Sequence, residues 1–165
     1  MSPADFGSFD GRDRRREVRM SPEEIEAFLR TCTNQMVLVT ANPDGSFHAV
    51  PMGYGYVDGQ IHMKSKSRAQ KVVNLKRDPR ATCMVSAGTQ YDELRGVQAV
   101  GRMEVVEDRD IVRAVTFDTM RRQDPEFVLD DRGQDLVARL SANYVALRLH
   151  PSRMLGWDHR KLAAT

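Results

Sequence analysis

The residues best suited to chemistry lie between positions 64 and 71, where the sequence reads Lys-Ser-Lys-Ser-Arg-Ala-Gln-Lys. Three lysines, one arginine and two serine hydroxyls fall within these eight residues. A strand-like segment precedes them and a helix-like segment follows, so free backbone N–H groups at a helix start are expected nearby. Cationic side chains and free N–H groups together bind phosphate well. The segment predicts a phosphate site, with a solvated basic turn as the alternative.

A second unusual segment covers residues 50–55, with the sequence Val-Pro-Met-Gly-Tyr-Gly. One proline and two glycines interrupt an otherwise regular strand pattern there. Such interruptions mark a bulge, or a place where backbone or ligand approaches closely. The segment is therefore either a strand along which a planar ring can lie, or an edge strand with a kink.

Other chemistries find little support in the sequence. The four histidines, at positions 48, 62, 150 and 159, lack the spacing of a metal site. There is no Gly-x-Ser-x-Gly motif, and neither cysteine has an evident histidine partner. Tyr54 and His48 could donate a proton, although we expect a structural role for each. The sequence therefore predicts no metal and identifies no catalytic residue.

Local signals define the elements that must position these residues. Ser21, Pro22 and Glu24 form a capping-box pattern, which predicts a helix over about 22–32. Turn signals at 42–45 and 58–59 separate strands expected at 35–41, 46–57 and 60–64. The rest of the pattern predicts helices at 67–77, 109–122 and 131–141, strands at 81–87, 97–106 and 144–150, and a short final segment through Trp157.

Tight turns and the absence of βαβ alternation make the expected sheet antiparallel. The predicted fold class is therefore mainly β with peripheral helices (α+β), built on about six strands that close, fully or partly, into a barrel. The chain has 165 residues, the size of one ordinary domain, and we place that domain at 21–165. Residues 1–20 are polar and rich in arginine, so we expect a disordered basic tail.

Composition narrows the function classes. The net charge is only +2, which argues against a dedicated nucleic-acid binder; a barrel that binds nucleic acid through its tail and basic loop is a weak alternative. The longest apolar runs have strand length, so no membrane span is predicted. Cys32 and Cys83 lie in separate apolar segments, which indicates reduced thiols and a cytoplasmic protein.

Several short motifs, in this order, resemble the pyridoxamine 5'-phosphate oxidase-like family of FMN-binding split β-barrels. The resemblance runs from about Pro22 to Leu162 and rests on the following segments: Asn42-Pro43-Asp44-Gly45-Ser46, His48-Ala49-Val50-Pro51, Lys71-Val72-Val73-Asn74-Leu75, Arg77-Asp78-Pro79-Arg80, Arg95-Gly96-Val97, Pro151-Ser152-Arg153 and Trp157.

The resemblance implies a six-stranded antiparallel split barrel that forms a homodimer with two cofactor sites, each built at the subunit interface. It assigns the cofactor ring to one strand, the phosphate to the basic segment, and the cofactor of the partner subunit to a C-terminal tryptophan. The implied cofactor-binding residues are Val50, Pro51, Met52, Gly53, Lys64, Ser65, Arg68, Gln70, Lys71 and Trp157.

Two departures bear on activity. The oxidase itself carries an Arg-Leu-His clamp after the tryptophan, where this chain has Asp-His-Arg-Lys-Leu at 158–162, and Gly96 stands in place of a glutamine. Oxidation of pyridoxamine phosphate is therefore not expected. The pattern is closer to the branch that uses coenzyme F420, with FMN as the alternative cofactor. The basic cluster holds more cations than a single phosphate monoester requires, which suits the anionic tail of F420.

These observations predict an oxidoreductase that transfers a hydride between bound F420, or FMN, and a small conjugated organic substrate. In such a protein the cofactor carries the redox chemistry and the chain orients it. The alternative is a split-barrel module that binds flavin or haem without turnover.

Overall fold

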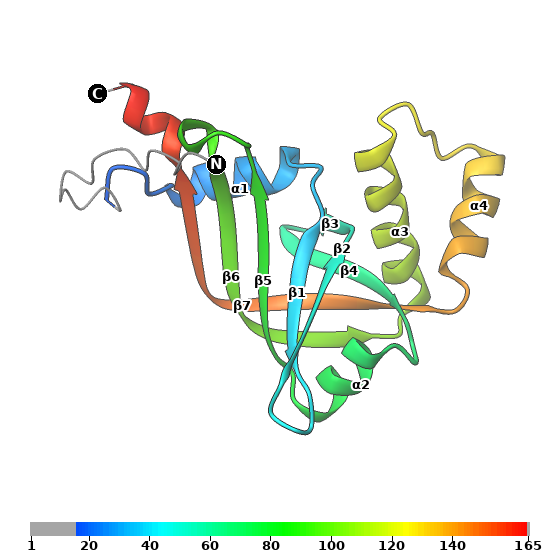
Figure 1. Cartoon of the computed structure of the whole chain (residues 1–165). Helices are drawn as coiled ribbons and strands as arrows, with labels where there is room; N and C mark the ends of the chain where they lie inside the picture. Colours follow the sequence, from blue (N-terminus) through cyan, green and yellow to red (C-terminus); the bar gives the residue numbers. More distant parts are fainter. Residues whose placement is uncertain (1–15, 165) are drawn as a thin grey trace, which may run out of the picture.

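The computed structural model describes residues 16–164, which form a strongly curled sheet with helices around it (Figure 1). In chain order its elements are α1 (Pro22–Thr31), β1 (Met36–Ala41), β2 (Phe47–Met52), β3 (Tyr54–Val57), β4 (Gln60–Lys66), α2 (Gln70–Arg77), β5 (Arg80–Ala87), η1 (Tyr91–Glu93), β6 (Arg95–Val106), α3 (Arg109–Gln123), α4 (Asp131–Ser141), β7 (Tyr144–Asp158) and η2 (His159–Ala164).

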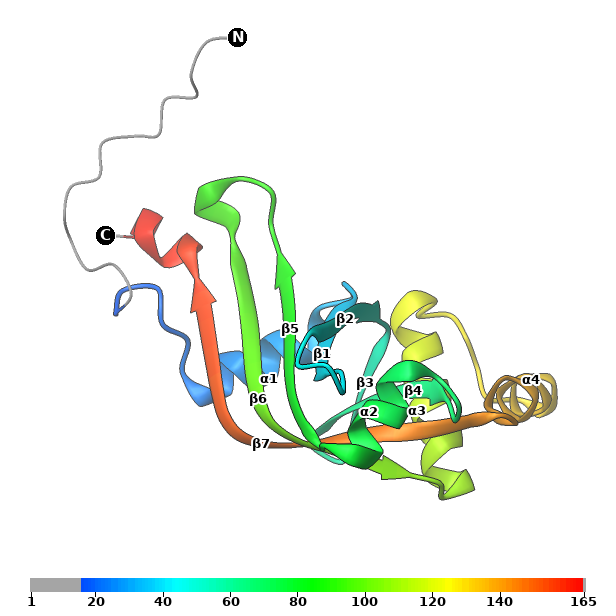
Figure 2. The same cartoon turned by 60° about the horizontal axis from the view of Figure 1, so that its bottom comes forward.

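The strands form one antiparallel sheet in the order β2-β1-β5-β6-β7-β4-β3. β2 and β3 therefore lie at opposite edges, yet they are consecutive in sequence and joined through Gly53 alone. The sheet must curl until the end of β2 lies next to the start of β3, as the two views in Figures 1 and 2 show. The antiparallel split barrel is confirmed, with seven strands in the described chain instead of six, because the strand expected at 46–57 divides at Gly53.

The division at Gly53 has a packing cause. A Cβ atom at Gly53 would lie 3.0 Å from Thr119 Cγ2, and one at Gly55 would lie 2.9 Å from Asp118 Oδ2. Both contacts are with α3, which packs closely on the segment where the chain crosses from one sheet edge to the other. The close approach that the glycines predicted is therefore made by a helix of the same chain.

Two element boundaries differ from expectation. The strand predicted at 144–150 continues to Asp158, because β7 bulges at Ser152, opposite Val100 and Gly101 of β6, and pairing goes on beyond Pro151. α2 begins at Gln70 and not at residue 67, because residues 67–69 form a turn. The other expected helices and strands are confirmed to within one or two residues at each end.

The main core lies between the inner face of the sheet and helices α1 and α2. Leu29, Leu38, Val72, Leu147 and Leu149 are fully buried there. A smaller apolar cluster, with Val112 and Val115 of α3, covers the far part of the sheet. α4 packs mainly against α3, at the outer end of the molecule (Figure 1).

The chain contacts the sheet before the expected domain boundary at residue 21. Val18 and Met20 are buried, and the backbone N–H of Asp158 donates to Val18 O at 2.8 Å. The N–H of Met20 donates to Gly156 O at 3.0 Å, so this segment runs beside the end of β7. The rest of the predicted tail, residues 1–15, lies outside the described residues. None of the helices described is long and apolar enough to span a membrane.

Candidate functional site

Five of the ten predicted site residues lie in one short part of the chain, residues 64–71, which we call the β4–α2 corner. Lys64 is half-buried at the end of β4, and Ser65 is buried with its hydroxyl 3.4 Å from Lys66 O. Arg68 is exposed in the connecting turn, and Lys71 is half-buried in the first turn of α2. The structure therefore brings these four side chains to one corner of the sheet.

The two half-buried lysines of the corner are desolvated, and no carboxylate among residues 16–164 compensates them. Burial lowers the pKa of Lys64 and of Lys71, and no other group contributes to either shift. Lys64 Nζ lies 5.1 Å from the ring centroid of Tyr144, a cation–π contact. A bound anion would stabilise the charged form of both lysines and offset the cost of their desolvation, so the corner is electrostatically suited to phosphate.

The first turn of α2 adds backbone donors to the same corner. Its N-cap, Ala69, has no side chain that can accept a hydrogen bond, and the first turn holds no acidic residue. The N–H of Ala69 donates to Lys66 O at 3.0 Å and that of Val72 to Ala69 O at 2.9 Å, so in the described chain the N–H groups of Gln70 and Lys71 are the ones left without a partner. The helix dipole favours an anion beside them. Lys71 lies in this turn, so its ammonium group and the free N–H groups act on the same region.

The ring-binding residues predicted on β2 differ in exposure. Pro51 is exposed, Val50 is half-buried, and Met52 is buried in the main core. Within the part of the chain that the structure describes, β2 pairs only with β1, so the backbone groups on its other side have no strand partner there. β3 pairs with β4 only as far as Met63, which leaves one side of residues 64–66 unpaired as well. The barrel is split between these two free edges.

The remaining two predicted residues have contacts within the chain. Gln70 Nε2 donates to Asn74 Oδ1 at 2.9 Å, so its amide is engaged inside α2. Trp157 lies near the end of β7, opposite Gly96 of β6, where a Cβ atom on Gly96 would come within 2.5 Å of the indole. Lys64, in contrast, pairs with Ala146 near the start of β7. A single chain therefore does not bring Trp157 to the β4–α2 corner.

Tyr54 and His48, the possible proton donors, have different positions. The Tyr54 hydroxyl is buried 2.8 Å from Leu29 O and 3.0 Å from Cys32 O, and burial raises its pKa to about 12. It is thus committed to the end of α1. His48 lies half-buried on β2, opposite Thr40.

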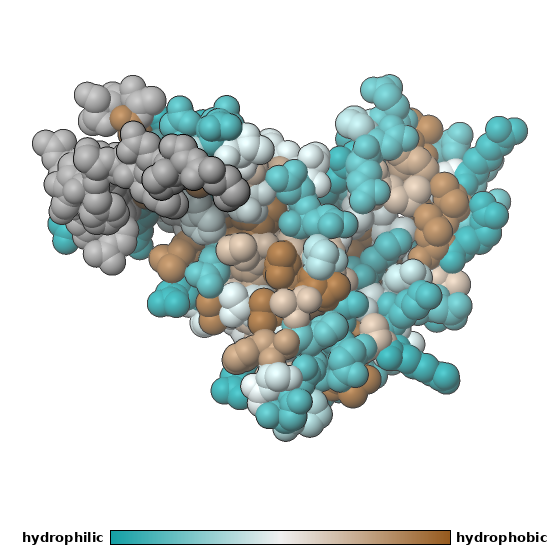
Figure 3. Space-filling view, viewed as in Figure 1, coloured by the Kyte–Doolittle hydropathy of each residue, from teal (hydrophilic) through white to brown (hydrophobic). Residues whose placement is uncertain are grey.

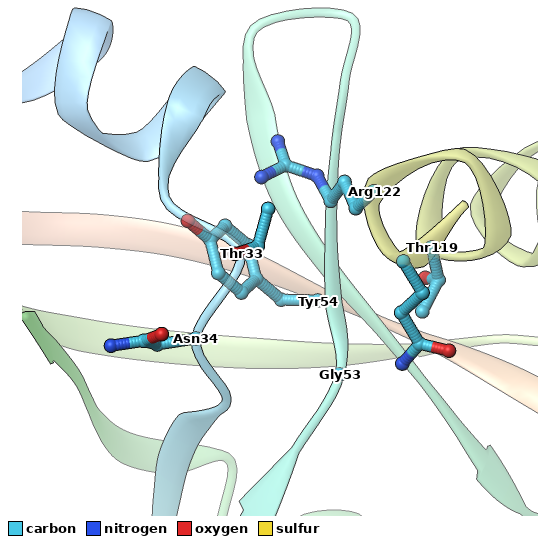
Figure 4. A pocket seen from close by; sticks show the side chains of 7 residues that line it. Thr33, Asn34, Gly53, Tyr54, Thr119 and Arg122 are labelled. Atoms are coloured by element: carbon cyan, nitrogen blue, oxygen red, sulfur yellow. The ribbon is translucent and has the colours of Figure 1, made fainter. Parts of the chain in front are cut away.

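Figure 4 shows the small cavity beside Gly53, where Tyr54 lies beneath the guanidinium of Arg122. Thr33, Asn34, Thr119 and Gln123 complete its lining. Its volume of about 10 Å³ has room for no more than one water. A larger hollow of about 520 Å³ lies between residues 16–25 and the end of β7, and none of the predicted site residues lines it.

Sequence reasoning missed two residues of this region. Tyr144 provides the aromatic face beneath Lys64. Asn74 is 1% exposed and joins α2 to β1 through its amide. An asparagine between the apolar residues of a helix, four positions after a glutamine, is the sequence signal that could have identified the second of these.

An apolar surface covers the side of the sheet that faces away from the main core, and we call it the outer sheet face. One residue from each of five neighbouring strands lies on this face, because each is paired with the next across the sheet. They are Pro51 of β2, Val37 of β1, Met84 of β5, Gln98 of β6 and Leu155 of β7. Met84 is 40% exposed and Leu155 38%. Figure 3 shows apolar residues gathered on this side of the molecule.

The curled antiparallel sheet, divided at Gly53 and flanked by helices, defines the chain as a split β-barrel. The pyridoxamine 5'-phosphate oxidase family model matches residues 21–158. The chain belongs to the pyridoxamine 5'-phosphate oxidase family of flavin-binding split barrels.

The solved structures most useful for comparison span almost the whole domain. A conserved hypothetical protein of Mycobacterium tuberculosis, Rv2991, is 34% identical with a TM-score of 0.84, over 92% of this chain and 93% of that one. A FAD-binding protein of Mesorhizobium loti shares the fold, with 21% identity and a TM-score of 0.62 over 84% of this chain and 94% of that one. An F420 reductase also shares it, with 20% identity and a TM-score of 0.60 over 81% of this chain and 98% of that one. No curated protein sequence matches the chain.

Proposed function

We propose that this protein is an oxidoreductase that transfers a hydride between a bound cofactor, coenzyme F420 or alternatively FMN, and a small conjugated organic substrate. The observation that carries the proposal is the pair of half-buried lysines, Lys64 and Lys71, beside the uncapped start of α2. Both cofactors present a phosphate, and the family to which the chain belongs binds flavins.

In this proposal the two free edges of the split barrel bind different parts of the cofactor. The ammonium groups of Lys64 and Lys71, with Arg68 at the rim, hold the phosphate. The side of Val50–Gly53 that faces away from β1 orients the ring. Free N–H groups of an edge strand can donate to the ring, except at Pro51, which has no N–H. When bound, the cofactor supplies hydride chemistry, and the chain contributes orientation and charge. Tyr54 takes no part, because its hydroxyl is held by the carbonyls of α1.

Charge favours F420 over FMN. Lys64, Lys66, Arg68 and Lys71 are four cations within eight residues, and none of them has a carboxylate within ion-pair distance in the described part of the chain. A phosphate monoester alone needs fewer. F420 carries a longer anionic tail, which the additional charge would attract. The similarity of fold to an F420 reductase is compatible with this preference.

We further propose that the protein acts as a homodimer whose outer sheet faces meet. Pro51, Met84 and Leu155 are exposed apolar residues on this face, and contiguous exposed apolar surface is a mark of protein interfaces. Trp157 lies at the end of the sheet that is remote from the β4–α2 corner of its own chain. It is paired with Gly96, two residues along from the Gln98–Leu155 pair, and so lies on the outer sheet face as well. In a dimer it would be available to the corner of the partner subunit.

The first test is titration of the purified protein with F420 and with FMN, followed by ring fluorescence. The wild-type chain should bind one of them with a Kd well below 0.1 mM. An Arg68→Ala, Lys71→Ala double variant should bind at least about tenfold more weakly, because charge-assisted hydrogen bonds to the phosphate are lost. Lys76→Ala, in the same helix but paired with Glu107 at 3.2 Å, is the matched control and should leave the affinity unchanged.

The outcomes separate the alternatives. Tight F420 binding alone supports the deazaflavin reaction, and tight FMN binding supports the flavin reaction. Unaltered affinity in the double variant contradicts the phosphate site at the corner. Tight binding without reduction of any conjugated acceptor supports the non-catalytic module, which the same family fold can serve.

A further inference from the structure

A network of hydrogen-bonded amide and hydroxyl groups, centred on the buried Asn74, connects α2 to β1 and the turn that follows β1. Asn74 Nδ2 donates to Thr40 Oγ1 at 3.1 Å and to Asn42 Oδ1 at 2.9 Å. Its Oδ1 accepts from Gln70 Nε2 at 2.9 Å. Asn74 and Thr40 are each 1% exposed. Both N–H groups and the oxygen of this amide are therefore satisfied by side chains of the protein.

The two ends of this hydrogen-bond network lie at the two halves of the candidate site. Gln70 is the first residue of α2 and the neighbour of Lys71. Asn42 closes the β1–β2 turn, with its N–H donating to Ser46 O at 2.8 Å and its Nδ2 donating to Ser46 Oγ at 3.0 Å. β2 begins at the next residue, Phe47. The hydrogen-bond network thus extends from the proposed phosphate-binding corner to the turn that leads into the proposed ring-binding strand.

Stability alone does not account for an asparagine at this position. Asparagine is a poor helix former, and burial of an amide is costly unless every hydrogen bond is made. The neighbouring Val72 and Leu75 already supply the apolar contacts of α2 with the core. Apolar contacts are tolerant of small displacements along the helix axis, whereas three directed hydrogen bonds are satisfied in one placement only.

We propose that Asn74 is a positioning residue for the cofactor. It holds the first turn of α2, and with it Lys71, at a fixed distance from β2, so that the phosphate and the ring of one molecule can be bound at the same time. This inference rests on the proposed function, because it requires that the corner binds the phosphate of a molecule whose ring lies along β2.

The test compares ligands with and without the phosphate. Dissociation constants are measured for FMN and riboflavin, and for F420 and the deazaflavin riboside that lacks its phosphate. In the wild-type chain the phosphorylated ligand should bind more tightly, and the ratio of the two constants measures the contribution of the phosphate. In Asn74→Leu this ratio should fall about tenfold, while the affinity for the riboside changes less than about threefold.

A second variant guards against misfolding of the first. Thr40→Val removes one acceptor of the Asn74 amide from the β1 side and leaves α2 unaltered, so the ratio should fall in the same direction. Thr116→Val is the matched control: its buried hydroxyl donates only within α3, to Val112 O at 2.8 Å. It should lower stability without changing the ratio, since it has no contact with α2.

Each outcome decides the matter. An unchanged ratio in folded Asn74→Leu or Thr40→Val, with a wild-type chain that discriminates, overturns the role of Asn74 and leaves the proposed function in place. A wild-type chain that binds riboside and phosphorylated cofactor equally overturns the phosphate site itself, and the positioning role with it.

Discussion

His62 is the residue whose ionisation is most closely linked to the fold. It is 2% exposed on β4; one ring nitrogen lies 3.1 Å from Gln60 O, and the other accepts from Arg148 Nε at 3.1 Å. Burial lowers its pKa, and the nearby Arg148 charge acts in the same direction. A neutral imidazole is needed to accept from the guanidinium, so protonation would break this contact.

This geometry predicts that stability falls as the pH drops below about 6.5. The unfolded chain takes up the proton at the ordinary histidine pKa, whereas the folded chain takes it up only at a lower pH. Between these two pKa values the free energy of unfolding falls by up to about 1.4 kcal/mol per pH unit. Urea denaturation at pH 7.0 and 5.5 measures the effect. His62→Gln, whose amide can still accept from Arg148, should lose less stability between these two values.

Glu104 does not obscure this measurement. Its pKa is also lowered, chiefly by the hydrogen bond with His150, but stability from a carboxylate is lost only as the pH falls below its unfolded value near 4.5. If His62→Gln and the wild-type chain lose equal stability between pH 7.0 and 5.5, protonation of His62 is not the cause.

At the scale of elements, Arg122 is the main polar connection between α3, α1 and β3. Its Nη1 donates to Leu29 O at 3.0 Å and to Cys32 O at 3.1 Å, at the carbonyl end of α1. Its Nε donates to Asp118 Oδ2 at 3.1 Å, and the same carboxylate accepts from the N–H of Tyr56 at 2.8 Å. The guanidinium also lies 4.6 Å from the centroid of the Tyr54 ring.

Arg122→Ala should therefore destabilise the chain by about 2–4 kcal/mol, because it leaves a partly buried carboxylate and two helix-end carbonyls without their cation. The free energy of unfolding in urea, followed by the fluorescence of the single tryptophan, measures this loss. Arg121→Ala is the control, since Arg121 is exposed, and it should change stability by less than about 0.5 kcal/mol. Equal losses in the two variants would contradict this role of Arg122.

Local signals were sufficient for most single elements. The capping box of α1 forms as expected, with the Glu24 N–H 3.3 Å from Ser21 Oγ and the Ser21 N–H 2.7 Å from Glu24 Oε2. Such contacts involve neighbours in sequence, so sequence alone can predict them. The length of β7 was missed because Pro151 reads locally as a strand end, whereas a bulge at Ser152 lets β7 stay paired with β6 as far as Asp158.

At the scale of the whole molecule, the outer sheet face makes a prediction about assembly. If two copies meet through this face, Met84→Arg should place an unpaired charge in the interface and shift the protein toward monomer. Sedimentation velocity or size-exclusion chromatography with light scattering measures the mass. The control is Val128→Arg, at a residue 62% exposed between α3 and α4, which should leave the mass unchanged. A Met84→Arg protein of the same mass as the wild type would contradict a dimer through this face.

Sequence by itself determined the local content of this protein. The helices and most strands follow from caps, turns and apolar periodicity, and the basic segment at 64–71 was recognised from its composition, because each of these depends on residues close together in the chain. Only the tertiary structure decided that α3 is what approaches Gly53 and Gly55, that Asn74 joins α2 to β1, and that Arg122 joins three elements. Those contacts join residues 32 to 93 positions apart, and the curl of the sheet, set by β2 and β3 at its opposite edges, brings them together.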